Sequence, residues 1–279
     1  MRHIDHVVVA VRDLDRAADA YGRLGFQVGV RNQHPWGTEN RLIQFGSSFI
    51  ELITPGAAAD RIAPHEPRRF SFGAFVRDFL GKREGTAMLV LSSADAVGDA
   101  AQFAESGVGA FEPFCFERRA QRPDGSETQV AFTLAFAHDP AAPHAGFFVC
   151  QQHFPQNFWS RSFQEHSNTA IDIAAVELTS SRPEQHVDFL AKFTGAANQM
   201  LATGASGFAL DGGFIELKSS PLLRSPLLNS LSIRVRQIDA VSRILSAERI
   251  PFSHSQQGIL LAPPSLFGVS LRFEEGIGS

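Results

Sequence analysis

The sequence RHIDHVVVAVRDLDRAADAYGRLGF, residues 2–26, opens the stretch that decides the fold, which continues to residue 55. Its run HVVVAV at residues 6–11 is rich in β-branched residues and too short for a helix, so it predicts a strand. Asp13 caps the next segment, where apolar residues recur at helical spacing, and Gly25 ends it. Extended pieces follow at residues 27–31, 38–45 and 48–53. The predicted order is strand, helix, strand, strand, strand.

The same pattern recurs three more times along the chain, and such repetition indicates an architecture built from copies of one unit. In the second copy Asp95 stands where Asp13 stands in the first. The third copy ends in GFIEL at residues 213–217, which nearly repeats SFIEL at residues 48–52. We expect modules at residues 1–54, 85–157, 168–220 and 228–275, paired into an N-terminal domain 1–157 and a C-terminal domain 168–279.

An insert at residues 55–84 separates the first two modules. Its segment 69–82 carries several phenylalanines and predicts a helix whose aromatic face packs on the domain. In the second module, residues 118–126 and 138–146 are rich in Pro, Gly, Asp and Ala, which is typical of loops.

The composition is that of an ordinary soluble globular protein, with 44% hydrophobic and 19% charged residues among 279. A net charge of −4 gives no electrostatic reason to expect nucleic acid or an anionic membrane as partner. Cys115 and Cys150 are the only cysteines, which excludes a disulfide framework and a cysteine-rich zinc site. Since the first strand leaves no room for a signal peptide and no apolar run approaches the ~20 residues of a membrane span, we expect a cytoplasmic protein. A homodimer stays open, because paired modules can assemble within one chain.

The segments HIDHVVVAVRDLDRAADAYGRLGF and GTENRLIQFGSSFIELI resemble the first module of the vicinal-oxygen-chelate superfamily, which includes glyoxalases, bleomycin-resistance proteins and extradiol dioxygenases. The match is best with the glyoxalase-like branch over the first 55 residues, and it weakens beyond them. The resemblance implies an α+β fold of four βαβββ modules, paired into two domains with curved mixed sheets. It also implies a divalent metal bound by a His on the first strand and a Glu on the last strand of a module, which are His6 and Glu51 here.

Glu51 lies within the apolar run FIELI, where a carboxylate is costly to bury unless a metal or an arginine accompanies it. His6 shares one face of its strand with Val8 and Ala10. Each residue has a plainer interpretation: a hydrogen-bonded histidine at a strand end, and a carboxylate that faces water at a sheet edge. The resemblance favours metal ligation by both.

The second module departs from the family pattern. Met88 aligns with His6, and a methionine is a poor ligand for a hard cation. Gln151 is the formal counterpart of Glu51, because each lies four residues before a proline. His153 shares the strand face of Gln151 and is expected to reach the same cavity. We therefore expect the metal ligands to be His6, Glu51 and Gln151, with the alternative that Gln151 and His153 only donate hydrogen bonds in a pocket.

The loop sequence HPWGTEN at residues 34–40 also resembles the glyoxalase-like branch. Loops at the mouth of a cavity often carry substrate contacts. His34 and Asn40 are therefore assigned to substrate binding or to support of Glu51, and Trp36 to a lid or to packing. Together with Met88 and His153, these residues form the predicted substrate site.

The resemblance implies a metal-dependent enzyme of the glyoxalase-like type, a lyase or isomerase, that acts on a small substrate with two neighbouring oxygens. Glu51 would be the catalytic base, and the divalent ion would be zinc, nickel, iron or manganese. Two alternatives stand beside it: an extradiol-type dioxygenase, and a metal-free binding protein of the bleomycin-resistance type, favoured by Met88 and the 25 phenylalanines. The C-terminal half has Glu216 without a partner and is interpreted as metal-free, and His186 as a histidine on a helix surface without a role.

Overall fold

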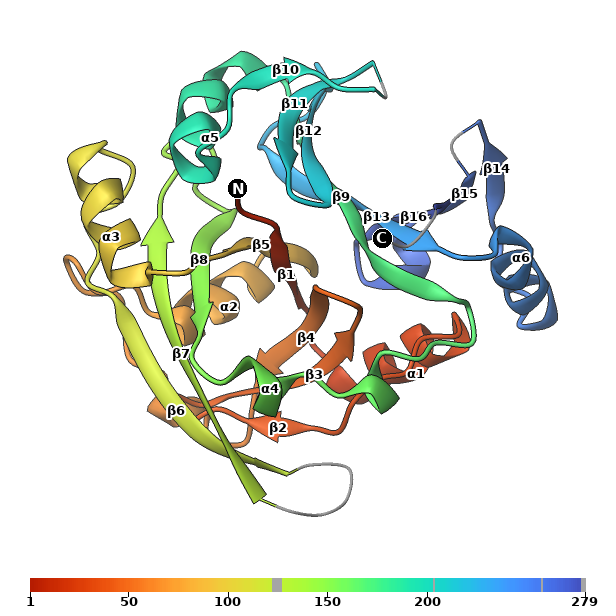
Figure 1. Ribbon diagram of the computed structural model, residues 1–279, viewed down its shortest axis with the longest axis horizontal. Coiled ribbons are helices and arrows are strands. Elements are labelled where there is room, and N and C mark those ends of the chain that lie inside the picture. The colour runs from red at the N-terminus through yellow and green to blue at the C-terminus, as the bar shows by residue number, and fades with distance from the viewer. Residues whose placement is uncertain (122–126, 203, 257, 277–279) are drawn as a thin grey trace.

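A computed structural model describes residues 1–121, 127–202, 204–256 and 258–276, and these residues form two curled eight-stranded sheets with flanking helices (Figure 1). The first sheet comes from the first two modules. Its elements are β1 (Ile4–Ala10), α1 (Leu14–Arg23), β2 (Asn32–Gln33), β3 (Thr38–Gln44), β4 (Phe49–Pro55), β5 (Gly85–Ser92), α3 (Ala96–Glu105), β6 (Phe114–Gln121), β7 (Glu127–Ala137) and β8 (Gly146–Gln152).

The second sheet repeats this arrangement after a linker that holds α4 (Pro155–Phe158) and a 3₁₀ turn, η2 (Arg161–Phe163). Its elements are β9 (Ala170–Ser180), η3 (Pro183–His186), α5 (Val187–Thr194), β10 (Asn198–Met200), β11 (Ser206–Leu210), β12 (Gly213–Ser219), β13 (Leu227–Val235), α6 (Ile238–Ala247), β14 (Ser253–Ser255), β15 (Gly258–Leu261), η4 (Pro263–Leu266) and β16 (Ser270–Glu275).

The strand order shows how the modules pair. The first sheet runs β2-β3-β4-β1-β5-β8-β7-β6, and the second runs β10-β11-β12-β9-β13-β16-β15-β14. In each sheet the two modules meet through an antiparallel pair, β1 with β5 or β9 with β13, while the first and last strands of a module pair in parallel. The α+β class and the four βαβββ modules are confirmed. The domain limits at residues 157 and 168 stay predictions.

Equivalent residues begin the first helix of each module in the first sheet. The Asp13 carboxylate accepts hydrogen bonds from the backbone of Asp15 and Arg16, and the Asp95 carboxylate accepts one from Gly98. Such caps satisfy backbone donors that have no partner within the helix. The alignment of Asp13 with Asp95 is therefore correct.

This alignment corrects one prediction about the second module. In the parallel pairs, Val8 lies opposite Glu51 on β4, and Val90 lies opposite Phe148 on β8. Because Val8 and Val90 are equivalent when Asp13 is aligned with Asp95, the counterpart of Glu51 is Phe148. The distance to a following proline misplaced this counterpart at Gln151, since the segments after β4 and β8 differ.

The insert folds against the inner face of the first sheet. It contains η1 (Ala59–Arg61) and α2 (Phe72–Leu80), and α2 lies within the curl of the sheet (Figure 1). The Ser71 hydroxyl caps α2 by accepting a hydrogen bond from Ala74. Buried side chains of α2 pack with apolar residues of the sheet in a core separate from the larger one under the outer helices. The predicted helix with an aromatic face is confirmed.

Two local predictions are wrong. Residues 27–31 were expected to be extended, but the strand in this region is only β2. Residues 118–126 were expected to be a loop, but β6 continues to Gln121 and β7 starts at Glu127, with residues 122–126 outside the described part. The alternation of Phe114, Phe116 and Arg118 has the period of a strand, which the charged residues around it obscured.

A buried polar contact joins the two halves. The Nδ1 atom of His186 lies 2.6 Å from Oδ2 of Asp139, and its Nε2 atom lies 3.0 Å from the Ser180 hydroxyl. All three residues are buried, with His186 only 1% exposed. The interpretation of His186 as a surface residue is therefore wrong.

Within the described residues, every helix is too short or too polar to cross a membrane.

Candidate functional site

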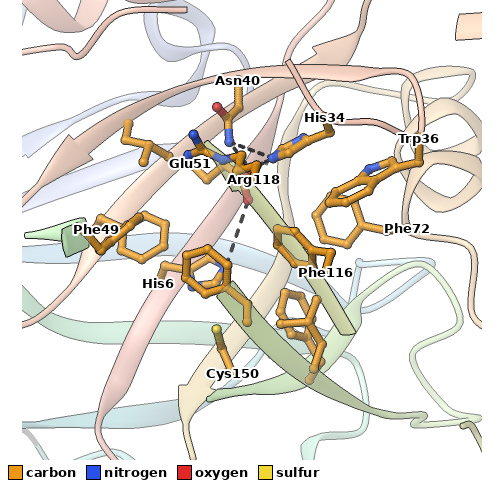
Figure 2. Close-up of a pocket in the computed structure, with 15 residues that line it drawn as sticks. His6, His34, Trp36, Asn40, Phe49, Glu51, Phe72, Phe116, Arg118 and Cys150 are labelled. Carbon is orange, nitrogen blue, oxygen red and sulfur yellow. Dashed lines mark hydrogen bonds and ion pairs between the residues drawn. The ribbon is translucent and has the colours of Figure 1, made fainter. Parts of the chain in front are cut away.

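The inner face of the first sheet holds a small, largely apolar pocket (Figure 2). Its accessible volume is about 50 Å³. Strands from both modules, the loop before β3, α2 and α4 supply its walls. The lining residues are His6, His34, Trp36, Asn40, Leu42, Phe49, Glu51, Phe72, Phe116, Arg118, Phe132, Leu134, Phe148, Cys150 and Phe158.

Glu51 is the acidic residue of this pocket, and its side chain is only 7% exposed. Its Oε1 atom accepts a hydrogen bond of 2.5 Å from the Asn40 amide. Its Oε2 atom lies 3.9 Å from Nε2 of His6. Burial raises the pKa of Glu51, and His6, Asn40 and Arg118 oppose that rise. The site thus holds a buried carboxylate with one oxygen fixed and the other facing an imidazole.

His6 is oriented from behind by a second carboxylate. Its Nδ1 atom lies 2.5 Å from Oδ1 of Asp5, and Oδ2 of Asp5 accepts a hydrogen bond from Gln152. The ladder between β1 and β5 shifts register between Ile4 and His6, and such irregularities re-aim side chains. The His6 ring also stacks on Phe49 with centroids 4.2 Å apart. With Nδ1 donating to Asp5, Nε2 of His6 points toward Glu51.

His34 and Asn40 form the other side of the polar cluster. The Asn40 amide nitrogen lies 3.3 Å from Nε2 of His34, and the Thr38 hydroxyl lies 2.9 Å from Nδ1. Burial, with a smaller contribution from the charge of Arg118, lowers the pKa of His34 to about 3. His34 is therefore neutral at physiological pH and accepts the Asn40 hydrogen bond at Nε2.

The loop that carries His34 and Trp36 is held in a tight shape. Gly37 has a positive φ of 96°, and a β-carbon there would lie 2.3 Å from the Ala58 carbonyl oxygen. Only glycine fits this turn. The Trp36 ring stacks on His34 with centroids 4.4 Å apart and makes edge contacts with Phe72. Trp36 therefore forms part of the pocket wall.

Three residues predicted for the site lie elsewhere. The Gln151 amide bonds the backbone of Ala94 and Ala96 at the start of α3, on the opposite face of β8 from Cys150, so it is not a ligand in this pocket. His153 is exposed, and its Nε2 lies 2.8 Å from the Thr133 hydroxyl. Strand alternation explains both errors, because only residues of even number on β8 face the pocket.

Met88 is the third residue that lies outside the pocket. It is fully buried in the core beneath α2, next to Gly146, and does not line the cavity. Its position on β5 does correspond to that of His6 on β1, because Asp13 and Asp95 are equivalent. The second module thus offers Met88 and Phe148 where the first has His6 and Glu51, and neither can replace them chemically.

Arg118 is a pocket residue that the sequence did not reveal. It lies on β6 at the end of the cavity that holds Glu51, Asn40 and His34 (Figure 2). Burial lowers the pKa of its guanidinium, and the nearby charge of Glu51 acts in the opposite direction. The period-two pattern through Phe116 was the signal that could have placed Arg118 on the inner face.

Cys150 also lines the pocket, but its surroundings keep the thiol protonated. Burial raises the pKa of Cys150 well above its ordinary value, and the charges of Asp5 and Glu51 add to the effect. A thiol in such a place is a poor nucleophile.

In the second sheet, Glu216 lies 3.9 Å from the Arg272 guanidinium, so that carboxylate has a cationic partner.

The donors for a divalent metal ion are fewer than the sequence predicted. His6 has the arrangement typical of a metal-ligating histidine, with one nitrogen bound by a carboxylate and the other facing Glu51. These two residues fit an ion that takes its other ligands from water or substrate. Throughout the described residues, no group of three or more His, Cys, Asp or Glu side chains is placed to hold one ion. The three-ligand set with Gln151 does not fit.

Comparisons with known proteins agree with this architecture. A family described as "Glyoxalase-like domain" matches residues 4–194. A hypothetical protein from Staphylococcus aureus has a TM-score of 0.72 at 14% identity, covering 99% of this chain and 100% of that chain. The Mn(II)-bound glyoxalase from Novosphingobium aromaticivorans has a TM-score of 0.58 at 12% identity, covering 98% and 81%.

A mutant of 4-hydroxymandelate synthase from Streptomyces coelicolor has a TM-score of 0.55 at 12% identity, covering 99% of this chain and 94% of that chain. At such low identities these structures share the fold and carry no further conclusion. No protein with a curated description matches the sequence.

Proposed function

The chain belongs to the glyoxalase-like domain family, and we propose that it is an enzyme that moves a proton at a carbon next to a carbonyl group of a small oxygenated substrate. The observation that supports this most is the buried carboxylate of Glu51, which faces a small apolar pocket and Nε2 of His6. A cavity that only held an apolar ligand would not require a carboxylate at this position, because burial of the charge is costly.

The pocket residues divide the work of such a proton transfer. Asn40 holds Oε1 of Glu51 and leaves Oε2 toward the cavity and His6. A substrate carbon placed against Oε2 would give its proton to Glu51, which later returns it to the same or the neighbouring carbon. The aromatic walls exclude water and so strengthen the carboxylate as a base. The carbonyl oxygen, which gains negative charge, would lie toward His6.

A divalent ion is part of this proposal. His6 and Glu51 would hold it, and when bound it would act as a Lewis acid toward the substrate oxygens. The extradiol alternative has less support, because it needs two histidines and a carboxylate around one ion. Nε2 of His34 lies 3.9 Å from Oε1 of Glu51, but the Asn40 amide is within hydrogen-bond distance of both atoms and so already engages them.

We expect Mn²⁺ to bind the wild-type protein, and His6→Ala and Glu51→Ala to weaken that binding by more than about tenfold, since each removes a donor. Gln151→Ala should bind Mn²⁺ like the wild type, because its side chain lies on the other face of β8. Electron paramagnetic resonance of free Mn²⁺ measures this binding. The assignment of His6 and Glu51 as ligands would be contradicted if Gln151→Ala lost its affinity for Mn²⁺. It would also be contradicted if His6→Ala and Glu51→Ala both bound Mn²⁺ as tightly as the wild type.

Deuterium exchange tests the proposed proton transfer without knowledge of the natural substrate. Hydroxyacetone in D₂O carries exchangeable protons on the carbon between its carbonyl and its hydroxyl. Wild-type protein is expected to speed the loss of their proton NMR signal above the rate in buffer with added Mn²⁺ alone. The proposal would be contradicted if the protein accelerated proton exchange neither in hydroxyacetone nor in pyruvate.

A binding protein without catalysis is the second candidate. The replacement of the equivalents of His6 and Glu51 by Met88 and Phe148, together with the phenylalanine walls, favours it. Such a protein would retain a small ligand through purification and return it chemically unchanged. Mass spectrometry of the denatured protein, set beside the exchange measurement, separates the two candidates.

A further inference from the structure

We infer that Arg118 binds a carboxylate of the substrate, so that the pocket takes a small 2-oxo or 2-hydroxy acid. This inference rests on the proposed function, because it names the substrate class of the same pocket. It adds an anion-binding residue on β6, a strand of the second module, to His6 and Glu51 on the first module.

Arg118 lies between the pocket and the surface of the protein. Its neighbour on the same strand face, Phe116, lines the pocket beside it. Arg118 also lines three surface clefts, and two of them, of about 460 and 230 Å³, share further residues with the pocket. The first also shares His34, and the second also shares Leu42 and Phe158. A substrate that enters from either cleft would therefore pass the Arg118 guanidinium.

The charge of Arg118 is not balanced locally. Among the residues that the structure describes, none forms a hydrogen bond or an ion pair with its guanidinium. Glu51 influences it through space, but the two groups do not form an ion pair within 4.0 Å. Other arginines contrast with it: Arg119 pairs with Glu127, and Arg31 pairs with Asp15. A half-buried cation without a close partner is costly unless a ligand completes it.

A carboxylate is the group that suits this cation. Guanidinium groups bind carboxylates through two parallel hydrogen bonds, which fix orientation as well as add affinity. A ligand held in this way at the Arg118 end would direct its next carbon toward Glu51 and His6. An oxygen on that carbon then faces His6 and Glu51, and any apolar remainder meets the phenylalanine walls.

The size of the cavity restricts the acid. The accessible volume of the pocket is about 50 Å³, which is small for a ligand site. A three-carbon acid such as pyruvate therefore matches it better than a large ring. Pyruvate and its amide, pyruvamide, are almost the same shape and differ in charge, so they make a matched pair of probes.

The test measures the binding of both probes by ligand-observed NMR to the wild-type protein, Arg118→Gln and Arg119→Gln. Arg119 is the matched control, since it follows Arg118 on β6, points outward and is 83% exposed. We expect Arg118→Gln to weaken pyruvate binding by about 10- to 100-fold, the usual range for a lost charged hydrogen bond. Pyruvamide binding should change by less than about twofold, and Arg119→Gln should affect neither probe.

Other outcomes would overturn the inference. One is an Arg118→Gln variant that binds pyruvate as tightly as the wild type, or that loses affinity equally for pyruvate and pyruvamide. Another is a wild-type protein that binds pyruvamide more tightly than pyruvate, or that binds neither probe. Circular dichroism confirms that the variants are folded. A protein that binds pyruvate through Arg118 but does not exchange hydroxyacetone or pyruvate protons would contradict the proposed function and leave this inference standing.

Discussion

Glu51→Gln is expected to slow deuterium exchange into hydroxyacetone by about 10²- to 10⁴-fold, the range over which general bases contribute to catalysis. Glutamine keeps the shape of the side chain but cannot accept a proton from carbon. Its amide can still contact Asn40 and His6, so the pocket should keep its form. The measurement is the decay of the CH₂ proton signal in D₂O at equal protein and Mn²⁺ concentrations.

Glu216→Gln is the matched control for this variant. Glu216 lies on the equivalent strand of the third module in the same FIEL sequence, but its carboxylate faces Arg272. Its substitution should leave the exchange rate unchanged. If Glu51→Gln retains the wild-type rate, or if Glu216→Gln loses it, the active site has been placed in the wrong sheet.

His186→Leu is expected to lower the free energy of unfolding by about 1–3 kcal/mol, the usual effect of leaving a buried polar group without its hydrogen-bond partner. The substitution leaves the Asp139 carboxylate buried with only a backbone bond from Ala141, and it leaves the Ser180 hydroxyl without its imidazole. Chemical denaturation followed by circular dichroism measures the change.

His254→Leu provides the comparison, because His254 lies exposed on the edge strand β14 and should tolerate the change within about 0.5 kcal/mol. Neither Asp139 nor His186 lines the active pocket. Folded His186→Leu should therefore keep its exchange rate. A stability equal to that of the wild type would show that the contact does not hold the two halves together.

The features that the sequence predicted are the ones encoded locally. The helix caps Asp13 and Asp95 and the glycines that follow these helices marked the first two modules, because a helix start needs only a few adjacent residues. Within the first module, His6, Asn40 and Glu51 lie on three adjacent strands. Their meeting in one pocket followed from the module pattern, and the structure brings them together with His34.

The features that the sequence did not predict depend on register or on distant partners. Gln151 was chosen from its spacing to a proline, but side chains alternate along a strand, and a shift of one residue moves a side chain to the other face. Arg118 reaches the pocket only because β6 closes the far edge of the sheet. His186 is buried by Asp139, 47 residues earlier, which no local pattern indicates.

The most direct test of the central claim is a crystal structure of the wild-type protein with pyruvate. The claim is that one pocket, inside the first sheet, binds a small oxygenated acid between Arg118 and Glu51. The expected result places the pyruvate carboxylate on the Arg118 guanidinium and the 2-oxo group toward His6 and Glu51. Pyruvate bound instead beside Glu216 on the second sheet, or an unchanged empty pocket at saturating pyruvate, would contradict the account.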